Sequence, residues 1–237
     1  VRVCTEITDE MIAENAKKPH EYFIIMFYHT LQKFPSKNKY IIYQLGLPYN
    51  TEDSIQDEEE YYTKMIEIFD NSVEWWEYSP TNLSLYPSQW KNKIRHLPLP
   101  IAIHDTPWRC IDYKYDLLFC GGVSDRRLKI LYALGERYKI KIIDSNFGYI
   151  DKKRLHNFIK KSKIILNLHS SEESNFEISR IHEALKFNKI IISEYPCKNE
   201  LALQDKYADC ADFIDIIKED HSNIDQLYNK IEQNLEN

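Results

Sequence analysis

The chain has 237 residues, of which 43% are hydrophobic and 13% aromatic, and its formal net charge is −6. This composition excludes collagen-like, low-complexity and disordered chains, because these lack the apolar side chains that build a core. The acidic balance argues against a nucleic-acid partner. No apolar run approaches the roughly 18 residues that span a bilayer, so no transmembrane segment is expected.

The five cysteines are odd in number and widely separated, and the sequence has no CxxC motif. We therefore expect free thiols in a reducing, cytoplasmic environment rather than disulfides or a zinc ribbon. Residues 1–13 carry acidic groups and have no apolar segment typical of a signal peptide. Cys120 lies in an apolar run and is expected in the core.

The first hundred residues predict a small α/β unit. The apolar run at 22–28 fits a buried strand or a helix, because periodicity alone does not separate the two. The other elements follow from apolar spacing and from turn residues at their ends. Helices are expected at 8–16, 61–69 and 83–91, and strands at 39–45, 73–78 and 94–97.

Residues 100–115 contain prolines and no sustained period, and we interpret them as a linker. After them, strands alternate with helices, a pattern typical of a doubly wound parallel sheet. Strands are expected at 115–120, 139–143, 163–168, 189–193 and 212–216, and helices at 124–138, 152–161, 178–187, 201–207 and 224–235. This pattern predicts a domain at 1–100, a Rossmann-like domain at 101–222 and a closing helix at 223–237.

Glycine is scarce, with five residues in the whole chain, and the one adjacent pair, Gly121 and Gly122, follows the first strand of the regular half. Two glycines between a strand and a helix let the backbone approach a phosphate at the helix N-terminus. Arg126 and Arg127 add bidentate donors in the first turn. Neither GxGxxG nor GxxxxGK[ST] is present, and an ordinary tight turn is the alternative.

Polar residues also follow the next inner strand and begin the helix after it. Asn167 and His169 end the strand at 163–168, and ligands bind outside the carboxyl ends of such strands. In the helix, Arg180 and Glu183 share one face at i, i+3 spacing, and a carboxylate there suits hydroxyl groups such as a ribose diol. The alternatives are a structural histidine and a surface ion pair.

Residues 115–216 resemble the nucleotide-sugar-binding half of GT-B glycosyltransferases, closest to the CgeB-like and group 1-type enzymes. The carrying segments are FCGGVSDRR at 119–127, SKIILNLHSS at 162–171 and EISRIHEALKFNKIIISE at 177–194. Weaker similarities upstream, IIYQL, WWEYSPTN and HLPLP, resemble acceptor-side segments. The resemblance implies a GT-B-like fold of two Rossmann-like halves with parallel sheets, in which the N-terminal half is abridged.

The resemblance also implies a function: transfer of a sugar from a nucleotide-sugar donor to an acceptor that the sequence does not identify, without a metal. No Asp-x-Asp motif occurs, which fits metal-independent chemistry, and no cofactor is expected beyond the nucleotide-sugar co-substrate. Arg180 would meet the diphosphate and Glu183 the ribose. The donor-binding residues implied are Gly121, Gly122, Arg126, Arg127, Asn167, His169, Glu177, Ser179, Arg180 and Glu183.

The alternative is a non-catalytic nucleotide-sugar-binding or assembly module with the same fold. Retaining GT-B enzymes place two glutamates eight residues apart, whereas here the earlier position is Asn175 and Glu177 is displaced by two. This departure and the short N-terminal half favour the module. A flavodoxin-type domain is a third interpretation, although Asp116 and Asp144 do not form the acidic cluster of response regulators.

Overall fold

The computed structural model describes residues 7–26, 31, 33–45, 58–84, 86–99, 112–148, 150–171, 176–196, 200–215 and 224–236. The chain divides into two compact units, Val1–Leu99 and Pro100–Asn237, which are treated separately below. Most of the expected linker, the boundary near 222 and Gly46 lie outside the described residues.

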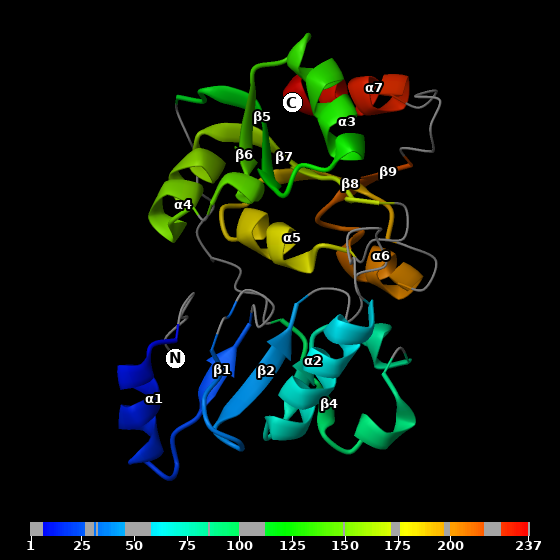
Figure 1. Cartoon of the computed structure of the whole chain (residues 1–237). Coiled ribbons are helices and arrows are strands. Elements are labelled where there is room, and N and C mark those ends of the chain that lie inside the picture. Colours follow the sequence, from blue (N-terminus) through cyan, green and yellow to red (C-terminus); the bar gives the residue numbers. More distant parts are fainter. Residues whose placement is uncertain are drawn as a thin grey trace. The chain divides into compact units, whose positions relative to one another are not determined.

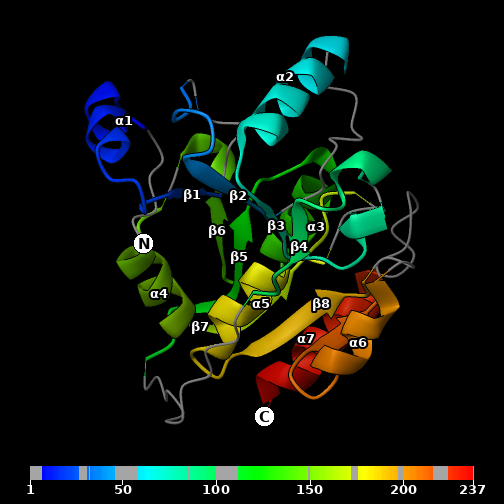
Figure 2. The same cartoon turned by 90° about the horizontal axis from the view of Figure 1, so that it is seen from below.

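The N-terminal unit is built on a parallel sheet of four short strands. They are β1 (Phe23–Ile25), β2 (Tyr40–Gln44), β3 (Trp75–Glu77) and β4 (Ile94–His96), and they lie side by side in chain order. Figure 2 shows α2 (Glu58–Asn71) lying over one face of this sheet. The apolar run that begins at Tyr22 therefore contains a strand, β1.

Aromatic side chains fill the core of this unit. Trp75 is fully buried, and its ring lies 5.3 Å from that of Phe69 on α2, which stacks on Trp90 at 4.2 Å. The hydroxyl of Tyr40 donates to the carbonyl of Ile68 at 2.9 Å, which joins the sheet to α2. The first helix, α1 (Asp9–Ala16), is shorter and has a side-chain N-cap at Thr8.

The helix predicted at 83–91 is not formed, so this prediction is wrong. Two 3₁₀ turns, η2 (Asn82–Ser84) and η3 (Ser88–Trp90), stand in its place. Pro87 precedes the second turn, and proline within a helix removes a backbone donor and clashes with the preceding turn. The apolar side chains Tyr86 and Trp90 of this segment are both buried, but the backbone that carries them is irregular rather than α-helical.

The C-terminal unit is a doubly wound α/β domain. Its strands are β5 (Tyr115–Gly121), β6 (Ile140–Asp144), β7 (Ser162–Asn167), β8 (Ile190–Glu194) and β9 (Asp212–Ile214). All are parallel, in the order β6-β5-β7-β8-β9. The helices between them are α3 (Asp125–Gly135), α4 (Lys152–Lys160), α5 (Ile178–Leu185) and α6 (Leu201–Tyr207), and α7 (Ile224–Glu236) follows β9.

Helices cover both faces of this sheet. Figure 1 shows α3 and α7 above the strands and α4, α5 and α6 below them. The strands are apolar on both sides because both faces are covered. Leu117 and Phe119 point into the cluster that contains Leu131 and Ile231, whereas Leu118 is buried outside that cluster. The expected α/β class with parallel, Rossmann-like sheets is thereby confirmed.

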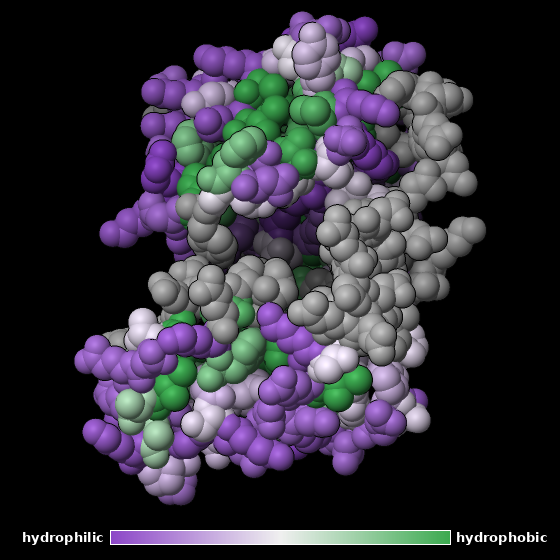
Figure 3. All heavy atoms as spheres, in the orientation of Figure 1, coloured by the Kyte–Doolittle hydropathy of each residue, from purple (hydrophilic) through white to green (hydrophobic). Residues whose placement is uncertain are grey.

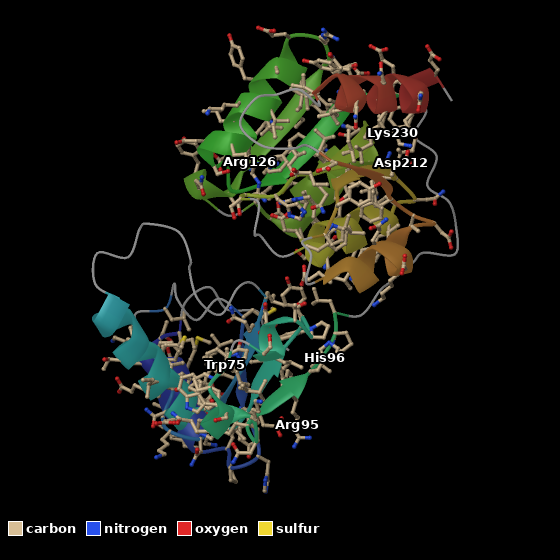
Figure 4. The ribbon with its side chains drawn as sticks, turned by 90° about the vertical axis from the view of Figure 1, so that its right-hand side faces the viewer. Trp75, Arg95, His96, Arg126, Asp212 and Lys230 are labelled. Carbon is tan, nitrogen blue, oxygen red and sulfur yellow. The ribbon has the colours of Figure 1, made fainter. Side chains whose placement is uncertain are left out.

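The last helix is an integral part of the C-terminal unit. Leu227, Tyr228 and Ile231 on α7 belong to the main core cluster. Figure 4 labels Asp212 at the start of β9 and Lys230 on α7, whose Oδ1 and Nζ atoms lie 3.0 Å apart. On the face of each unit visible in Figure 3, hydrophilic side chains surround smaller groups of hydrophobic ones.

Candidate functional site

The sheet of the C-terminal unit has a switch point between β5 and β7. From β5 the chain moves outward through α3 to β6, and from β7 it moves the other way through α5 to β8. In open α/β sheets, ligands bind in the crevice at the carboxyl ends of the strands where the order reverses. In this domain those ends are Gly121 and Asn167, so the sequence-predicted residues around them define the candidate site.

Arg127 is one of two arginines anchored directly at the switch point. Its Nε donates to the carbonyl of Leu168 at 3.0 Å, its Nη1 to the carbonyl of Gly122 at 2.7 Å, and its Nη2 to a carboxylate oxygen of Glu177. The side chain is 6% exposed. Burial lowers the pKa of Arg127, which the Glu177 carboxylate partly offsets. Arg127 therefore ties the end of β7 to the start of α3.

Arg180, in the first turn of α5, is the second anchored arginine. Its Nε donates to the carbonyl of Cys120 at 2.7 Å, and its Nη1 donates to Asn167 Oδ1 at 2.6 Å and to Glu177 Oε2 at 2.8 Å. The guanidinium carbons of Arg180 and Arg127 lie 4.9 and 5.4 Å from the centre of the buried Phe119 ring. Both guanidinium groups therefore lie over the Phe119 ring, and both donate to the carboxylate of Glu177.

Arg126 forms a separate ion pair at the neighbouring strand end. It is the second residue of α3 (Figure 4) and makes a two-pronged contact with Glu194 at the end of β8. Its Nη1 also donates to the carbonyl of His169 at 3.0 Å, and the His169 amide donates to Glu194. Three arginines and two glutamates therefore gather at the carboxyl ends of β5, β7 and β8, a net charge of +1.

His169 is held in a defined orientation beside this cluster. Its Nε2 lies 3.0 Å from the carbonyl of Tyr195, which is an acceptor only, so Nε2 carries the proton. The side chain is buried, and Nδ1 has no hydrogen-bond partner among the described residues. Buried polar atoms are nearly always paired. Nδ1, which carries no proton, is thus a buried hydrogen-bond acceptor beside the switch point that receives no hydrogen bond from the described residues.

The glycine pair makes room for side chains of the protein itself. A Cβ atom at Gly121 would collide with Nη2 of Arg180, and one at Gly122 would lie 3.0 Å from Oδ1 of Asn146. The sequence interpretation attributed this room to a phosphate. In the structure the guanidinium of Arg180 lies against the turn, so glycine is required there for the arginine to reach the switch point.

Two of the predicted residues are placed differently from the rest. Ser179 is exposed in the first turn of α5. Glu183 does not pair with Arg180: its carboxylate contacts Nε2 of His156 at 2.8 Å, on α4, and Nζ of Lys186. The surface ion pair between Arg180 and Glu183, which was the alternative interpretation, is therefore not formed. Side chains on a helix lean toward its N-terminus, which brings Arg180 back to Glu177.

The electrostatics of Glu183 follow from these contacts. Burial acts to raise its pKa, but the hydrogen bonds from Lys186 and His156 outweigh burial, and the pKa is lowered. Glu183 thus has its own partners, His156 and Lys186, apart from the contacts that join the arginine cluster.

A buried carboxyl group in the N-terminal unit was missed by the sequence interpretation. Glu77, at the carboxyl end of β3, is fully buried and accepts from the Ser79 amide at 2.9 Å, from Asn82 Nδ2 at 3.0 Å and from the Tyr86 hydroxyl at 2.7 Å. Burial raises the pKa of Glu77 to about 7. The sequence contains an indication of this burial, because Glu77 lies among the apolar and aromatic residues of the predicted strand VEWWEY.

No group of three or more His, Cys, Asp or Glu side chains that could hold a metal ion is present among the residues the structure describes. Within the same residues, no helix has the length and apolar character needed to cross a membrane.

Comparison with known proteins identifies a similar viral protein but no family. No family model matches the chain. The chain is 30% identical over 172 residues to the uncharacterized protein R358 of Acanthamoeba polyphaga mimivirus. The match covers 68% of this chain and 58% of that protein, so the chain spans less than two thirds of the relative's length.

Proposed function

We propose that the C-terminal unit binds a nucleoside diphosphate sugar at the switch point between β5 and β7, and that the protein is a metal-independent glycosyltransferase. The observation that carries this proposal is the gathering of Arg126, Arg127 and Arg180 at adjacent strand ends, where doubly wound domains bind their ligands. Arginine forks match the geometry of phosphate oxygens.

Arg180 is the best-placed residue for a diphosphate. Its Nε and Nη1 are occupied, whereas Nη2 donates no hydrogen bond to any described residue and lies against Gly121. Helix α5 begins at the same place and has no side-chain N-cap at Glu177. A guanidinium nitrogen with no hydrogen-bond acceptor among the described residues, beside a helix N-terminus without a side-chain cap, favours the binding of an anion.

The cluster suits sugar transfer because the departing group is a nucleoside diphosphate. When the bond between the sugar and the diphosphate breaks, negative charge grows on the leaving oxygen. Fixed cations held by Glu177, Cys120 and Leu168 would stabilise that charge without reorganising. The residues FCGGVSDRR and EISRIHEALKFNKIIISE, which resemble GT-B donor sites, contain these arginines.

The binding proposal is tested by calorimetry with UDP-, GDP-, TDP- and CMP-compounds. We expect at least one to bind, and we expect Arg180→Gln to weaken it at least tenfold. Arg95→Gln is the matched control, since Arg95 is exposed in the other unit and pairs with Glu74. A folded protein that binds none of these compounds refutes the donor site, as does equal affinity in both variants.

The alternative, a non-catalytic donor-binding module, is separated by product analysis. A transferase releases nucleoside diphosphate or hydrolyses the bound donor slowly, whereas a module binds the donor and leaves it intact. One observation favours the module: Arg126 is already paired with Glu194, and Arg127 with Glu177. Cations that are already paired stabilise the charge of a leaving group less.

A further inference from the structure

The edge of the C-terminal unit formed by β6 and α4 is strongly basic. Between residues 139 and 163 the chain has eight lysines and arginines and two aspartates, a net charge of +6, although the whole chain carries −6. Lys141 on β6 lies over the ring of Phe158 on α4, with Nζ 4.9 Å from the ring centre. This contact joins a lysine of the strand to the helix.

Phe147 projects from the same edge. It ends the 3₁₀ turn η4 (Ser145–Phe147) and is 92% exposed, more than any other large hydrophobic side chain among the described residues. The turn is well anchored: Asp144 Oδ1 accepts from the amides of Asn146 at 2.9 Å and Val123 at 3.1 Å. An ordered turn thus holds an apolar ring out in water.

Three cations that follow Phe147 in the sequence occupy positions that lower the stability of their helix. Lys152, Lys153 and Arg154 are exposed and occupy the first turn of α4, where the helix dipole disfavours positive charge. Lys153 and Arg154 form no ion pair with the residues the structure describes, and Lys152 Nζ lies 4.0 Å from Glu183. Sites that break local rules of stability are expected to be functional.

We infer that Phe147, Lys152, Lys153 and Arg154 form a docking surface for an anionic lipid membrane. An aromatic ring flanked by exposed lysine and arginine is the pattern of side chains that settle at a membrane interface and meet acidic headgroups. The overall negative charge does not prevent this, because charges more than about 10 Å away are screened at physiological salt.

Charge complementarity favours an anionic partner for this basic segment, and the single projecting ring favours a membrane over a nucleic acid. Proteins that bind single strands present several stacking rings along a basic groove. In residues 139–163, by contrast, Phe147 is the one exposed aromatic side chain among those described.

The test is co-sedimentation of the full chain with vesicles of phosphatidylcholine alone or with 30% phosphatidylglycerol. We expect binding to the acidic vesicles and its loss at high salt. One basic residue near an acidic surface strengthens binding about fivefold, so Lys152→Gln, Lys153→Gln and Arg154→Gln together should lower the partition coefficient roughly a hundredfold. Phe147→Ser should lower it about tenfold.

A second triple variant, Lys17→Gln, Lys37→Gln and Lys91→Gln, removes the same charge from exposed positions in the other unit and should bind almost as well as the wild type. Circular dichroism checks that each variant is folded. The inference is overturned if acidic vesicles do not bind, if both triple variants lose binding equally, or if a phosphate polymer such as a DNA oligonucleotide binds through these residues and vesicles do not.

Discussion

Replacing Glu77 by glutamine should change how the stability of the N-terminal unit depends on pH. Burial raises the pKa of Glu77 to about 7 in the folded protein, and the hydrogen bonds from Ser79, Tyr86 and Asn82 offset burial only in part. The ordinary value, 4.5, applies to the unfolded chain. Between these two values the folded state holds a proton that the unfolded state has lost.

The sign and size follow from this difference. Because the folded state binds more protons, the free energy of unfolding falls as pH rises from 4.5 to about 7. Protonated Glu77 contributes fully below 4.5, and the contribution is lost above the folded pKa. The whole window corresponds to about 3 kcal/mol, since one pH unit is worth about 1.4 kcal/mol. Glutamine does not titrate, so Glu77→Gln lacks this slope.

Urea unfolding followed by tryptophan fluorescence measures the effect, because three of the four tryptophans, Trp75, Trp76 and Trp90, lie in the N-terminal unit. We expect the free energy of unfolding of the wild type, taken relative to that of Glu77→Gln, to fall by about 2–3 kcal/mol from pH 5 to pH 7.5. Glu67→Gln, an exposed change on α2, should show no such trend. A difference that stays constant with pH refutes the reasoning.

Two further pairs of variants test the packing of the C-terminal unit. Leu131→Ala empties a side chain that is 1% exposed and should lower the free energy of unfolding by about 2–5 kcal/mol, whereas Leu128→Ala, at a position 54% exposed on the same helix, should cost less than about 0.5 kcal/mol. Gly121→Ala should destabilise by about 1–3 kcal/mol because the new methyl group meets Arg180. Gly135→Ala has only an ordinary contact at 3.7 Å and should stabilise by roughly 0.5 kcal/mol. Chemical denaturation measures all four, and equal effects within either pair would contradict the packing described.

The regular half of the fold could be predicted because local signals agree with one another there. Ser124 caps α3 through a hydrogen bond to the Arg127 amide, as its place before the apolar spacing indicates. The apolar runs of β5 and β7 are buried on both faces, which is what a covered parallel sheet requires. The strand order was not predictable, because it depends on contacts between elements far apart in the chain.

The side-chain partners at the site were harder to predict than their positions. From helical spacing alone, the sequence placed Arg180 and Glu183 on one face of the helix, with a surface ion pair between them as the alternative. In the structure, Glu177 lies within reach of Arg180 and Arg127, and His156 on α4 takes Glu183. Such choices depend on which neighbouring helix supplies the nearer opposite charge, and spacing within one helix carries no information about that.

The most direct test of the donor site is hydrogen exchange of backbone amides, measured by mass spectrometry with and without the best nucleotide sugar from the binding panel. The ligand should slow exchange in peptides that cover 121–127 and 167–180, at the carboxyl ends of β5 and β7. Peptides from β1 and β2 should be unchanged if the ligand contacts only the C-terminal unit. Protection that leaves 121–127 and 167–180 unaffected would contradict a donor site at the switch point.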